Sequence, residues 1–313
     1  IMATGMMVEG KWTNEEYKQD QKGRFQRNPT TFRNQITADG SSGFPAVSNR
    51  YHLYVSYACP WAHRTLIMLQ LKGLTEAISI SVVDPLMAED GWSFSNFPGT
   101  IPDTVNHARY LREVYAIADA KYTGRVTVPI LWDKQTASIV NNESREIIRM
   151  FDTQFGDIAQ NEIDLYPNEL QEKIDRAIDD IYDPINNGVY KAGFAKSQEA
   201  YEEAVKKLFV ALDYWEEILA QQDYLCGDSL TEADICLFTT LFRFDAVYYV
   251  HFKCNLRHIW DYPNLWNYVK KIYQQPQIKA TCNLEHIKLH YYQSHPHINP
   301  SGIVPYGPAI EFT

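Results

Sequence analysis

The chain has 313 residues, 45% of them hydrophobic and 22% charged, and a formal net charge of −10. This length favours two domains, and an acidic chain without a basic stripe argues against nucleic acid as a partner. No apolar run approaches the roughly 20 residues of a transmembrane helix, and the polar N-terminus has no apolar signal core, so we expect no membrane partner and a cytoplasmic location.

The cysteines indicate the redox compartment. They are odd in number, and none falls in a Cys-x-x-Cys pair or at Cys/His ligand spacing. This pattern argues against a disulfide framework and against a structural zinc site, so we expect free thiols in a reducing compartment and no metal. The five are Cys59, Cys226, Cys236, Cys254 and Cys282.

The first elements in chain order are an arm, a strand and a helix. Residues 1–50 are polar and interrupted by Gly, Ser and Pro, so we expect an irregular N-terminal arm. Residues 51–56 are aromatic and β-branched, which predicts a strand, and residues 65–71 are mostly long and apolar, which predicts a packed helix. Pro60 then falls at the first helical position and Cys59 at the N-cap.

Cys59 is the strongest candidate nucleophile. Free backbone N–H groups and the positive end of the helix dipole stabilise an anion at the N-cap, and thiols so placed have pKa values of about 3.5 to 7.5. Position 62 is Ala62, so no Cys-x-x-Cys disulfide can form, and Cys59 would form mixed disulfides that another thiol, such as glutathione, resolves. The alternative is a buried structural thiol.

The following elements complete an α/β domain over residues 51–157. The pattern continues with a strand, a polar loop that contains Trp92, a helix, a strand that carries Pro129, a fourth strand and a last helix. This order of elements is the thioredoxin topology. The predicted ranges are 78–83, 84–106, 108–120, 126–133, 137–140 and 141–151.

The last part of the chain is helical throughout. After a linker near 156–167, apolar residues recur at helical spacing, which predicts an all-α domain over residues 166–313 with a C-terminal extension. Thr231 and Asp234 have the spacing of a capping box, which we assign to folding because a capping box satisfies backbone donors wherever it occurs. The predicted helices are 170–185, 199–220, 233–250 and 265–273.

Five motifs spread over nearly the whole chain carry a resemblance to a known family. They are Cys-Pro-Trp-Ala at 59–62, Arg-x-Thr-Val-Pro-x-Leu-Trp-Asp at 125–133, Asn-Glu-Ser at 142–144, Tyr-Lys-Ala-Gly-Phe-Ala at 190–195, and His-Tyr-Tyr-x-Ser-His at 290–295 followed by Ile-Asn-Pro-Ser-Gly-Ile-Val-Pro at 298–305. Together they resemble the cytosolic glutathione transferases and, within that superfamily, the Xi class of S-glutathionyl-hydroquinone reductases. The resemblance implies a thioredoxin-like glutathione-binding domain, an all-α domain, glutathione as co-substrate and a homodimer.

The resemblance also assigns a glutathione site. Val128 and Pro129 are similar to the family's Val-cis-Pro, whose valine backbone pairs with the cysteinyl part of glutathione. Glu143 and Ser144 would hold the γ-glutamyl amine and carboxylate, although capping alone would also explain Ser144. Two further residues complete the set: Arg125 would pair with a glutathione carboxylate, and Trp92 would lie over glutathione, against the alternatives of a surface arginine and a core tryptophan.

A second, aromatic substrate is expected between the domains, where pockets commonly form. By resemblance the family's substrate tyrosines fall on Tyr190 and Tyr292, with Tyr291 as a neighbour that remains open. Phenolic hydroxyl groups suit a hydroquinone because they can exchange hydrogen bonds and protons with its ring hydroxyls. His290 and His295 are further candidates for proton transfer, whereas His63 is expected to pack or cap.

The predicted reaction is the glutathione-dependent reduction of an S-glutathionyl-hydroquinone to the free hydroquinone. It would pass through a mixed disulfide between Cys59 and glutathione and release oxidised glutathione, with Tyr190 and Tyr292 in catalytic roles. Two alternatives remain open. One is an Omega-like thioltransferase or dehydroascorbate reductase that uses the same cysteine, and the other is a non-enzymatic binding module with the same fold.

Overall fold

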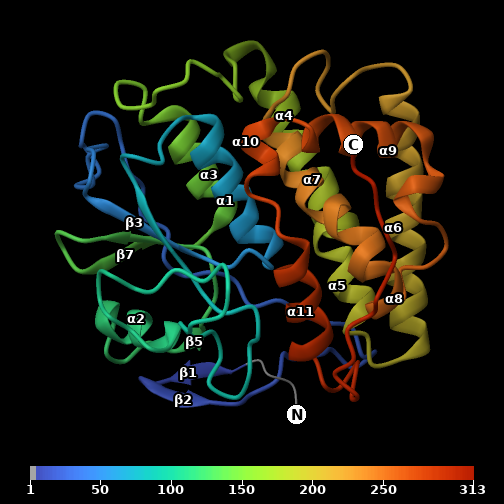
Figure 1. The fold of residues 1–313 in the computed structure, drawn as a ribbon, viewed down its shortest axis with the longest axis horizontal. Helices are drawn as coiled ribbons and strands as arrows, with labels where there is room; N and C mark the ends of the chain where they lie inside the picture. Colours follow the sequence, from blue (N-terminus) through green and yellow to red (C-terminus); the bar gives the residue numbers. More distant parts are fainter. Residues whose placement is uncertain (1–4) are drawn as a thin grey trace. The chain divides into compact units, whose positions relative to one another are not determined.

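The computed structural model describes residues 5–313 (Figure 1). These residues form two compact units, and each unit is discontinuous in sequence. The first unit contains the described residues up to Glu16, Asn28–Ile163 and Thr281–Gly302, and the second contains Tyr17–Arg27, Asp164–Ala280 and Ile303–Thr313. The predicted arm is therefore divided between the two units, and its residues 1–4 lie outside the described part of the chain.

A four-stranded sheet is the centre of the first unit. Its order is β4-β3-β6-β7, in which β4 is parallel to β3, and β6 is antiparallel to both β3 and β7. The two central strands are buried along their whole length, as expected for a sheet that is covered on both faces. The bounds are β3 Tyr51–Val55, β4 Ser79–Val82, β6 Ile130–Asp133 and β7 Ser138–Asn141.

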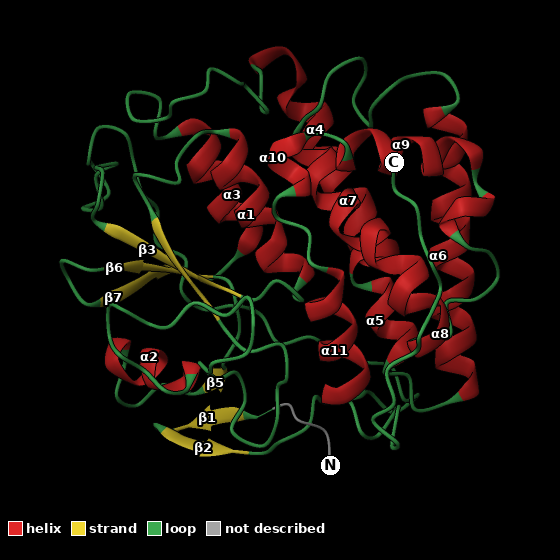
Figure 2. Cartoon of the chain, in the orientation of Figure 1, coloured by secondary structure: helices red, strands yellow, loops and turns green. Residues whose placement is uncertain are grey.

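Three helices cover this sheet. Figure 2 shows α1 and α3 together on one side of it and α2 on the other, and α1 and α3 contact each other. The helices are α1 Pro60–Leu71, α2 Leu111–Ala118 and α3 Ser144–Thr153. Apart from one short strand that belongs to another sheet, the order along the chain is strand, helix, strand, helix, two strands and a helix, so the thioredoxin topology predicted from the sequence is confirmed.

The N-terminal arm is more regular than predicted. β1 (Met6–Val8) and β2 (Lys11–Thr13) form a hairpin, and β5 (Gly124–Arg125) pairs with the other edge of β1. Glu9 and Gly10 both have positive φ at the hairpin turn, the backbone shape that two-residue hairpin loops favour. The prediction of an irregular arm was wrong here because strands of two or three mixed residues are too short to show a period.

The second unit is helical. The predicted helices are confirmed, but two of them continue into a π-helical segment, η2 after α4 and η3 after α7. The elements are η1 Asn168–Leu170, α4 Gln171–Ile181, η2 Tyr182–Asn186, α5 Gly188–Gly193, α6 Gln198–Leu219, α7 Glu232–Arg243, η3 Phe244–Tyr248, α8 Tyr249–His251, η4 Ile259–Asp261, α9 Pro263–Tyr273 and α10 Pro276–Lys279. Within residues 5–313, no helix has both the length and the apolar character needed to cross a membrane.

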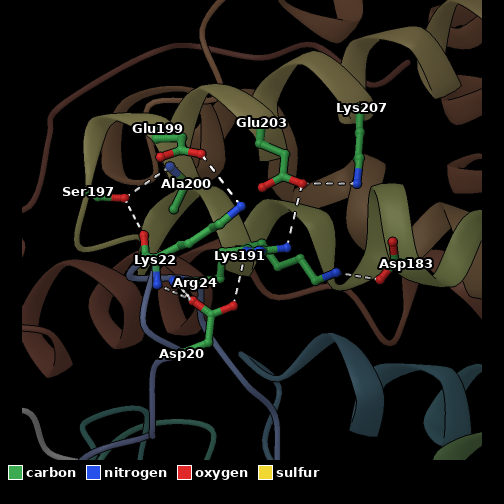
Figure 3. Close-up of polar contacts among 10 residues, drawn as sticks. All are labelled: Asp20, Lys22, Arg24, Asp183, Lys191, Ser197, Glu199, Ala200, Glu203 and Lys207. Carbon is green, nitrogen blue, oxygen red and sulfur yellow. Dashed lines mark hydrogen bonds and ion pairs between the residues drawn. The ribbon is translucent and has the colours of Figure 1, made fainter.

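The arm segment 17–27 is bound tightly within this helical unit (Figure 3). Lys196 N donates to Gly23 O at 2.9 Å, and the Ser197 hydroxyl donates to Lys22 O at 2.6 Å. The Arg24 guanidinium lies 3.7 Å from the Glu203 carboxylate. This segment is thus an integral part of the helical unit.

The C-terminal extension is also divided. α11 (Leu284–Ser294) belongs to the first unit, whereas the last eleven residues belong to the second, where the Phe312 ring lies 4.8 Å from Phe242 and 5.1 Å from Tyr273. The sequence assigned the whole of 166–313 to the helical domain. The difference arises because α11 buries its face against a loop that is distant in sequence, which no local pattern reveals.

Candidate active site

Cys59 occupies the predicted position. It is the N-cap of α1 in extended conformation, followed by Pro60 at the first helical position, and its side chain makes no capping hydrogen bond. Its carbonyl already accepts from His63 N at 3.0 Å, so α1 begins directly at the thiol. The residue is 8% exposed. A thiolate here would face the positive end of the α1 dipole.

The loop before β6 lies against this thiol. The Val128–Pro129 peptide bond is cis, as the resemblance implied, and the Cys59 thiol donates to Val128 O at 3.7 Å. The predicted strand 126–133 is shorter in the structure, because β6 begins at Ile130, one residue after the cis bond. Pro129 is therefore outside the strand ladder, where its missing N–H costs no ladder hydrogen bond.

Glu143 and Ser144 open α3, as predicted. Glu143 is the N-cap, and its carboxylate accepts from Arg145 N at 3.2 Å and from the Thr30 hydroxyl at 3.1 Å. Ser144 is the first helical residue, and its hydroxyl oxygen accepts from Arg64 Nη1 at 3.4 Å. Helix capping is thus the work of Glu143, which leaves the Ser144 hydroxyl proton for another acceptor.

Arg125 has a use that the sequence did not reveal. Its guanidinium donates to Glu16 O at 2.7 Å, to Glu15 O, and to Asn28 Oδ1 at 3.4 Å, and the side chain is buried. Arg125 therefore holds the backbone of the N-terminal arm against the end of β5. Its predicted pairing with a glutathione carboxylate stays a prediction.

Trp92 is held by α11. Its ring stacks on His290 at 4.7 Å with an interplanar angle of 20°, and His290 Nδ1 lies 2.9 Å from Pro85 O. Met87 N donates to the Ser294 hydroxyl at 3.0 Å, so a second residue of α11 fastens the same loop. These contacts place the α11 tyrosines in the unit that contains Cys59.

The candidate substrate tyrosines fall into two groups. Tyr291 and Tyr292 are buried residues of α11 in the first unit, and burial raises the pKa of Tyr292 to about 12. Tyr190 belongs to the second unit, on α5, where its ring lies 5.3 Å from Phe252 and 4.8 Å from the Arg27 guanidinium carbon. Tyr190 is therefore packed among aromatic rings of the second unit, and the two α11 tyrosines are buried in the first.

Two further histidines of the first unit, His63 and His295, are buried and make packing or hydrogen-bond contacts. His63 is buried, with Nε2 2.8 Å from the Thr281 hydroxyl, which agrees with the expected packing role. His295 is buried near Tyr291, with ring centroids 5.9 Å apart. The His63 side chain thus joins the segment Thr281–Gly302 to α1, whereas the contact of His295 with Tyr291 lies within that segment.

The sequence missed one charged residue of this region. Arg64 lies on α1, is buried, and contacts Ser144 as well as the Trp61 ring, 4.8 Å from the guanidinium carbon. The available signal was an arginine directly before the apolar run of the active-site helix, because arginine is rarely buried without a partner.

Across residues 5–313, no group of three or more His, Cys, Asp or Glu side chains is arranged to hold a metal ion. A cavity of about 210 Å³ lies in the second unit, and none of the predicted site residues lines it. Its charged side chains are paired with one another, as in Lys191 with Asp183 and Lys207 with Glu203 (Figure 3).

Comparisons with known proteins agree with this architecture. Residues 58–154 match the family described as "Glutathione S-transferase, N-terminal domain", and residues 198–271 match "Glutathione S-transferase, C-terminal domain". Glutathionyl-hydroquinone reductase YqjG of Escherichia coli (strain K12) is 54% identical over 97% of this chain and 95% of that protein.

Two solved structures are similar over nearly the whole chain. A Xi-class glutathione transferase from Natrialba magadii superposes with a TM-score of 0.94 and 53% identity, covering 99% of this chain and 95% of that one. The glutathione-bound structure of YqjG has a TM-score of 0.91 and 52% identity, covering 98% and 97% of the two chains. The chain described here therefore belongs to the glutathione transferase family and, within it, to the Xi class.

Proposed function

We propose that this protein reduces S-glutathionyl-hydroquinones to free hydroquinones with glutathione as the reductant. The observation that carries the proposal is the single cysteine at the N-terminus of α1, Cys59, which lies beside the cis Val128–Pro129 bond and lacks a second cysteine at position 62. A thiol in this setting is suited to a mixed disulfide with an external thiol. The name of the E. coli relative supports the same reaction.

The glutathione site in this proposal is the one that surrounds Cys59. Val128 would pair through its backbone with the cysteinyl part of glutathione, and Pro129 would hold the bend that exposes that backbone. Glu143 would accept the γ-glutamyl ammonium group, and Ser144 would donate to the γ-glutamyl carboxylate at the N-terminus of α3.

Two further residues would complete this site. Trp92, fixed by its stack on His290, would cover the bound glutathione. Arg125 would pair with a glutathione carboxylate from its position on β5, next to the arm that it holds. Both assignments rest on the Xi-class resemblance together with their burial in the first unit.

The reaction takes two steps, and in each step a thiolate attacks the glutathionyl sulfur. The Cys59 thiolate attacks the glutathionyl sulfur, a disulfide forms, and the bond between sulfur and the ring carbon breaks with its electron pair on the carbon. That carbon takes a proton from a tyrosine or from water and becomes the C–H of the hydroquinone. A second glutathione thiolate attacks the glutathionyl sulfur of the mixed disulfide, which releases oxidised glutathione and restores Cys59. The two glutathione sulfurs are oxidised, and the ring carbon is reduced.

Tyrosines would bind the hydroquinone and supply the proton. Tyr292 is the proposed donor because its phenol carries a proton at neutral pH, where burial holds its pKa at about 12, and a developing ring carbanion is basic enough to take that proton. Tyr291 is its buried neighbour on α11. Tyr190 is proposed as a further contact to the hydroquinone on the strength of the resemblance, since it belongs to the helical unit.

The test is glutathione-dependent hydroquinone release from glutathionyl-menadiol by the wild type and by Cys59→Ser. Dehydroascorbate and a generic mixed disulfide are assayed in parallel. We expect fast release that depends on Cys59 and exceeds turnover of the other two substrates. Activity on dehydroascorbate or the mixed disulfide alone would assign an Omega-like role, and absence of all three activities would leave a binding module.

Two properties of the whole protein belong to the same proposal. We expect a homodimer and a cytoplasmic location, as the family resemblance implies. Light scattering coupled to size-exclusion chromatography measures the first property, and a monomeric mass at micromolar concentration would contradict it.

A further inference from the structure

The first unit contains several cations that are buried or nearly buried, and three of them have a carboxylate or carbonyl partner. Lys72, at the C-terminus of α1, lies 3.1 Å from the Asp152 carboxylate of α3. Arg50 makes two hydrogen bonds to Asp133, at 2.9 and 2.8 Å. Arg125 donates to backbone carbonyls of the arm. Lys72 and Arg50 are therefore paired with carboxylates, and Arg125 is hydrogen-bonded to carbonyl oxygens.

Arg64 differs from these residues. It is 3% exposed, yet none of the described residues forms an ion pair with it, and its Nε is buried without a hydrogen-bond partner. Its contacts are the Trp61 ring, 4.8 Å from the guanidinium carbon, and the Ser144 hydroxyl, 3.4 Å from Nη1. A buried guanidinium without a counter-charge is costly, so this arrangement points to an anion that binds from outside.

The contact with Ser144 defines where that anion would lie. Because Nη1 donates to the Ser144 oxygen, the hydroxyl proton points elsewhere and can donate to a ligand. Ser144 is the first residue of the ten-residue helix α3, so the positive end of the helix dipole acts at the same place. Three features, the guanidinium charge, the oriented hydroxyl and the helix N-terminus, all favour a carboxylate.

We propose that Arg64 is a positioning residue for glutathione, which holds the Ser144 hydroxyl as a donor and supplies the counter-charge for the γ-glutamyl carboxylate. This inference rests on the proposed function, because that function places the γ-glutamyl group at Glu143 and Ser144. It adds a residue outside the motifs that identified the site. It also explains why a positive charge is buried on the active-site helix.

The test compares two ligands that differ only in this carboxylate. They are S-methylglutathione and the analogue in which 4-aminobutyrate replaces the γ-glutamyl residue, and both bind without thiol chemistry. Isothermal titration calorimetry measures their affinities for the wild type, Arg64→Met and Arg64→Lys. The matched control is Arg109→Met, since Arg109 is an exposed arginine of the same unit whose guanidinium carbon lies 5.2 Å from the Tyr110 ring.

We expect the wild type to bind S-methylglutathione more tightly than the analogue. Arg64→Met should weaken S-methylglutathione binding by about 10- to 100-fold, the range for a hydrogen bond to a buried charge, and should change analogue binding by less than about 2-fold. Arg64→Lys should retain part of the preference because it retains the charge. Arg109→Met should behave as the wild type.

Equal weakening of both ligands in Arg64→Met would overturn the inference, since it would mean a purely structural role. If that variant fails to fold, Arg64→Lys decides in the same way, because a loss shared by both ligands contradicts the inference there too. The binding assay is independent of turnover. If the protein prefers S-methylglutathione through Arg64 but releases no hydroquinone, only the proposed reaction is contradicted. If it releases hydroquinone but its preference for S-methylglutathione does not depend on Arg64, only this inference is contradicted.

Discussion

The cysteines show how position decides the chemistry of a residue type. Cys59 lies at a helix N-terminus with its thiol directed to Val128 O. Burial raises the pKa of the Cys226 thiol to about 11, and complete burial also raises the pKa of Cys254. At neutral pH the latter two thiols are protonated, and the protonated form is a poor nucleophile.

This difference predicts selective alkylation. Treatment of the native protein with iodoacetamide at pH 7 should modify Cys59 well before Cys226 and Cys254, because only a thiolate reacts at a useful rate. Peptide mass spectrometry over a time course gives the rate at each site. Alkylation after unfolding serves as the control, since all three thiols should then react alike. Equal rates in the native protein would contradict the prediction.

Tyr292 permits a separation of binding from chemistry. Tyr292→Phe removes the phenolic proton and keeps the ring, so we expect hydroquinone release to slow by about 100-fold, within the usual range for a general acid. Formation of the mixed disulfide between Cys59 and glutathione from oxidised glutathione, which involves no hydroquinone, should be unaffected. Single-turnover assays measure both reactions, and Tyr306→Phe, at a fully exposed tyrosine, is the control. Equal loss of both steps would assign Tyr292 to structure.

At the scale of elements, the start of α7 shows why a short sequence motif can be reliable. The Asp234 carboxylate accepts from Thr231 N at 2.8 Å, as the predicted capping box requires. It also accepts from Leu225 N at 2.9 Å and from the Tyr268 hydroxyl at 2.7 Å, two contacts that the motif did not reveal. One carboxylate therefore joins the helix start to the preceding turn and to α9.

The same carboxylate predicts a pH effect on stability. Burial raises the pKa of Asp234 from 3.8 to about 6 against the opposing effect of its hydrogen bonds. Between these values the folded state binds more protons than the unfolded state, so the contribution of Asp234 to stability falls as the pH rises through this window. The stability advantage of the wild type over Asp234→Asn should be about 1 kcal/mol smaller at pH 7 than at pH 5.

Urea unfolding at the two pH values measures this change. Asp228→Asn, at an exposed carboxylate of the same segment, is the matched control and should show no comparable dependence. An advantage that grows toward pH 7 would mean that hydrogen bonding to the carboxylate outweighs its burial.

At the scale of the whole molecule, the path of the chain differs from a simple succession of two domains. Segments from the N-terminal arm and from the C-terminal extension belong to each unit. In the second unit, Phe25 of the arm is buried, with its ring 5.0 Å from Tyr17 and 5.3 Å from Phe194. The arm therefore contributes core side chains to helices that are far away in sequence.

We expect Phe25→Ala to lower the free energy of unfolding by about 3 kcal/mol, the cost of removing a buried phenylalanine. Denaturant unfolding followed by tryptophan fluorescence measures this loss. Val210→Ala on α6 is the control, because Val210 is 70% exposed. A loss for Phe25→Ala no larger than that of the control would mean that the arm is dispensable for the stability of the second unit.

Local pattern determined much of this protein. The sequence predicted the strand before Cys59, the N-cap position of that residue and the proline at the start of α1. It also predicted that α3 begins at Glu143 and Ser144. These features depend on side-chain period, capping and dihedral preference, which act over a few residues. The motifs were sufficient to identify the family because the cysteine and its turn are adjacent in sequence.

Only the tertiary structure decided which distant segments meet. Four contacts illustrate this, and each joins residues that are 80 or more positions apart. β1 pairs with β5, Arg125 holds the arm, and Arg64 contacts Ser144. α11 holds the loop around Trp92, across a separation of nearly 200 positions. Such contacts are selected by burial and by the need to satisfy buried polar groups across the whole molecule. No local period encodes them, so a residue such as Arg64 becomes visible as a candidate only when its missing counter-charge is seen.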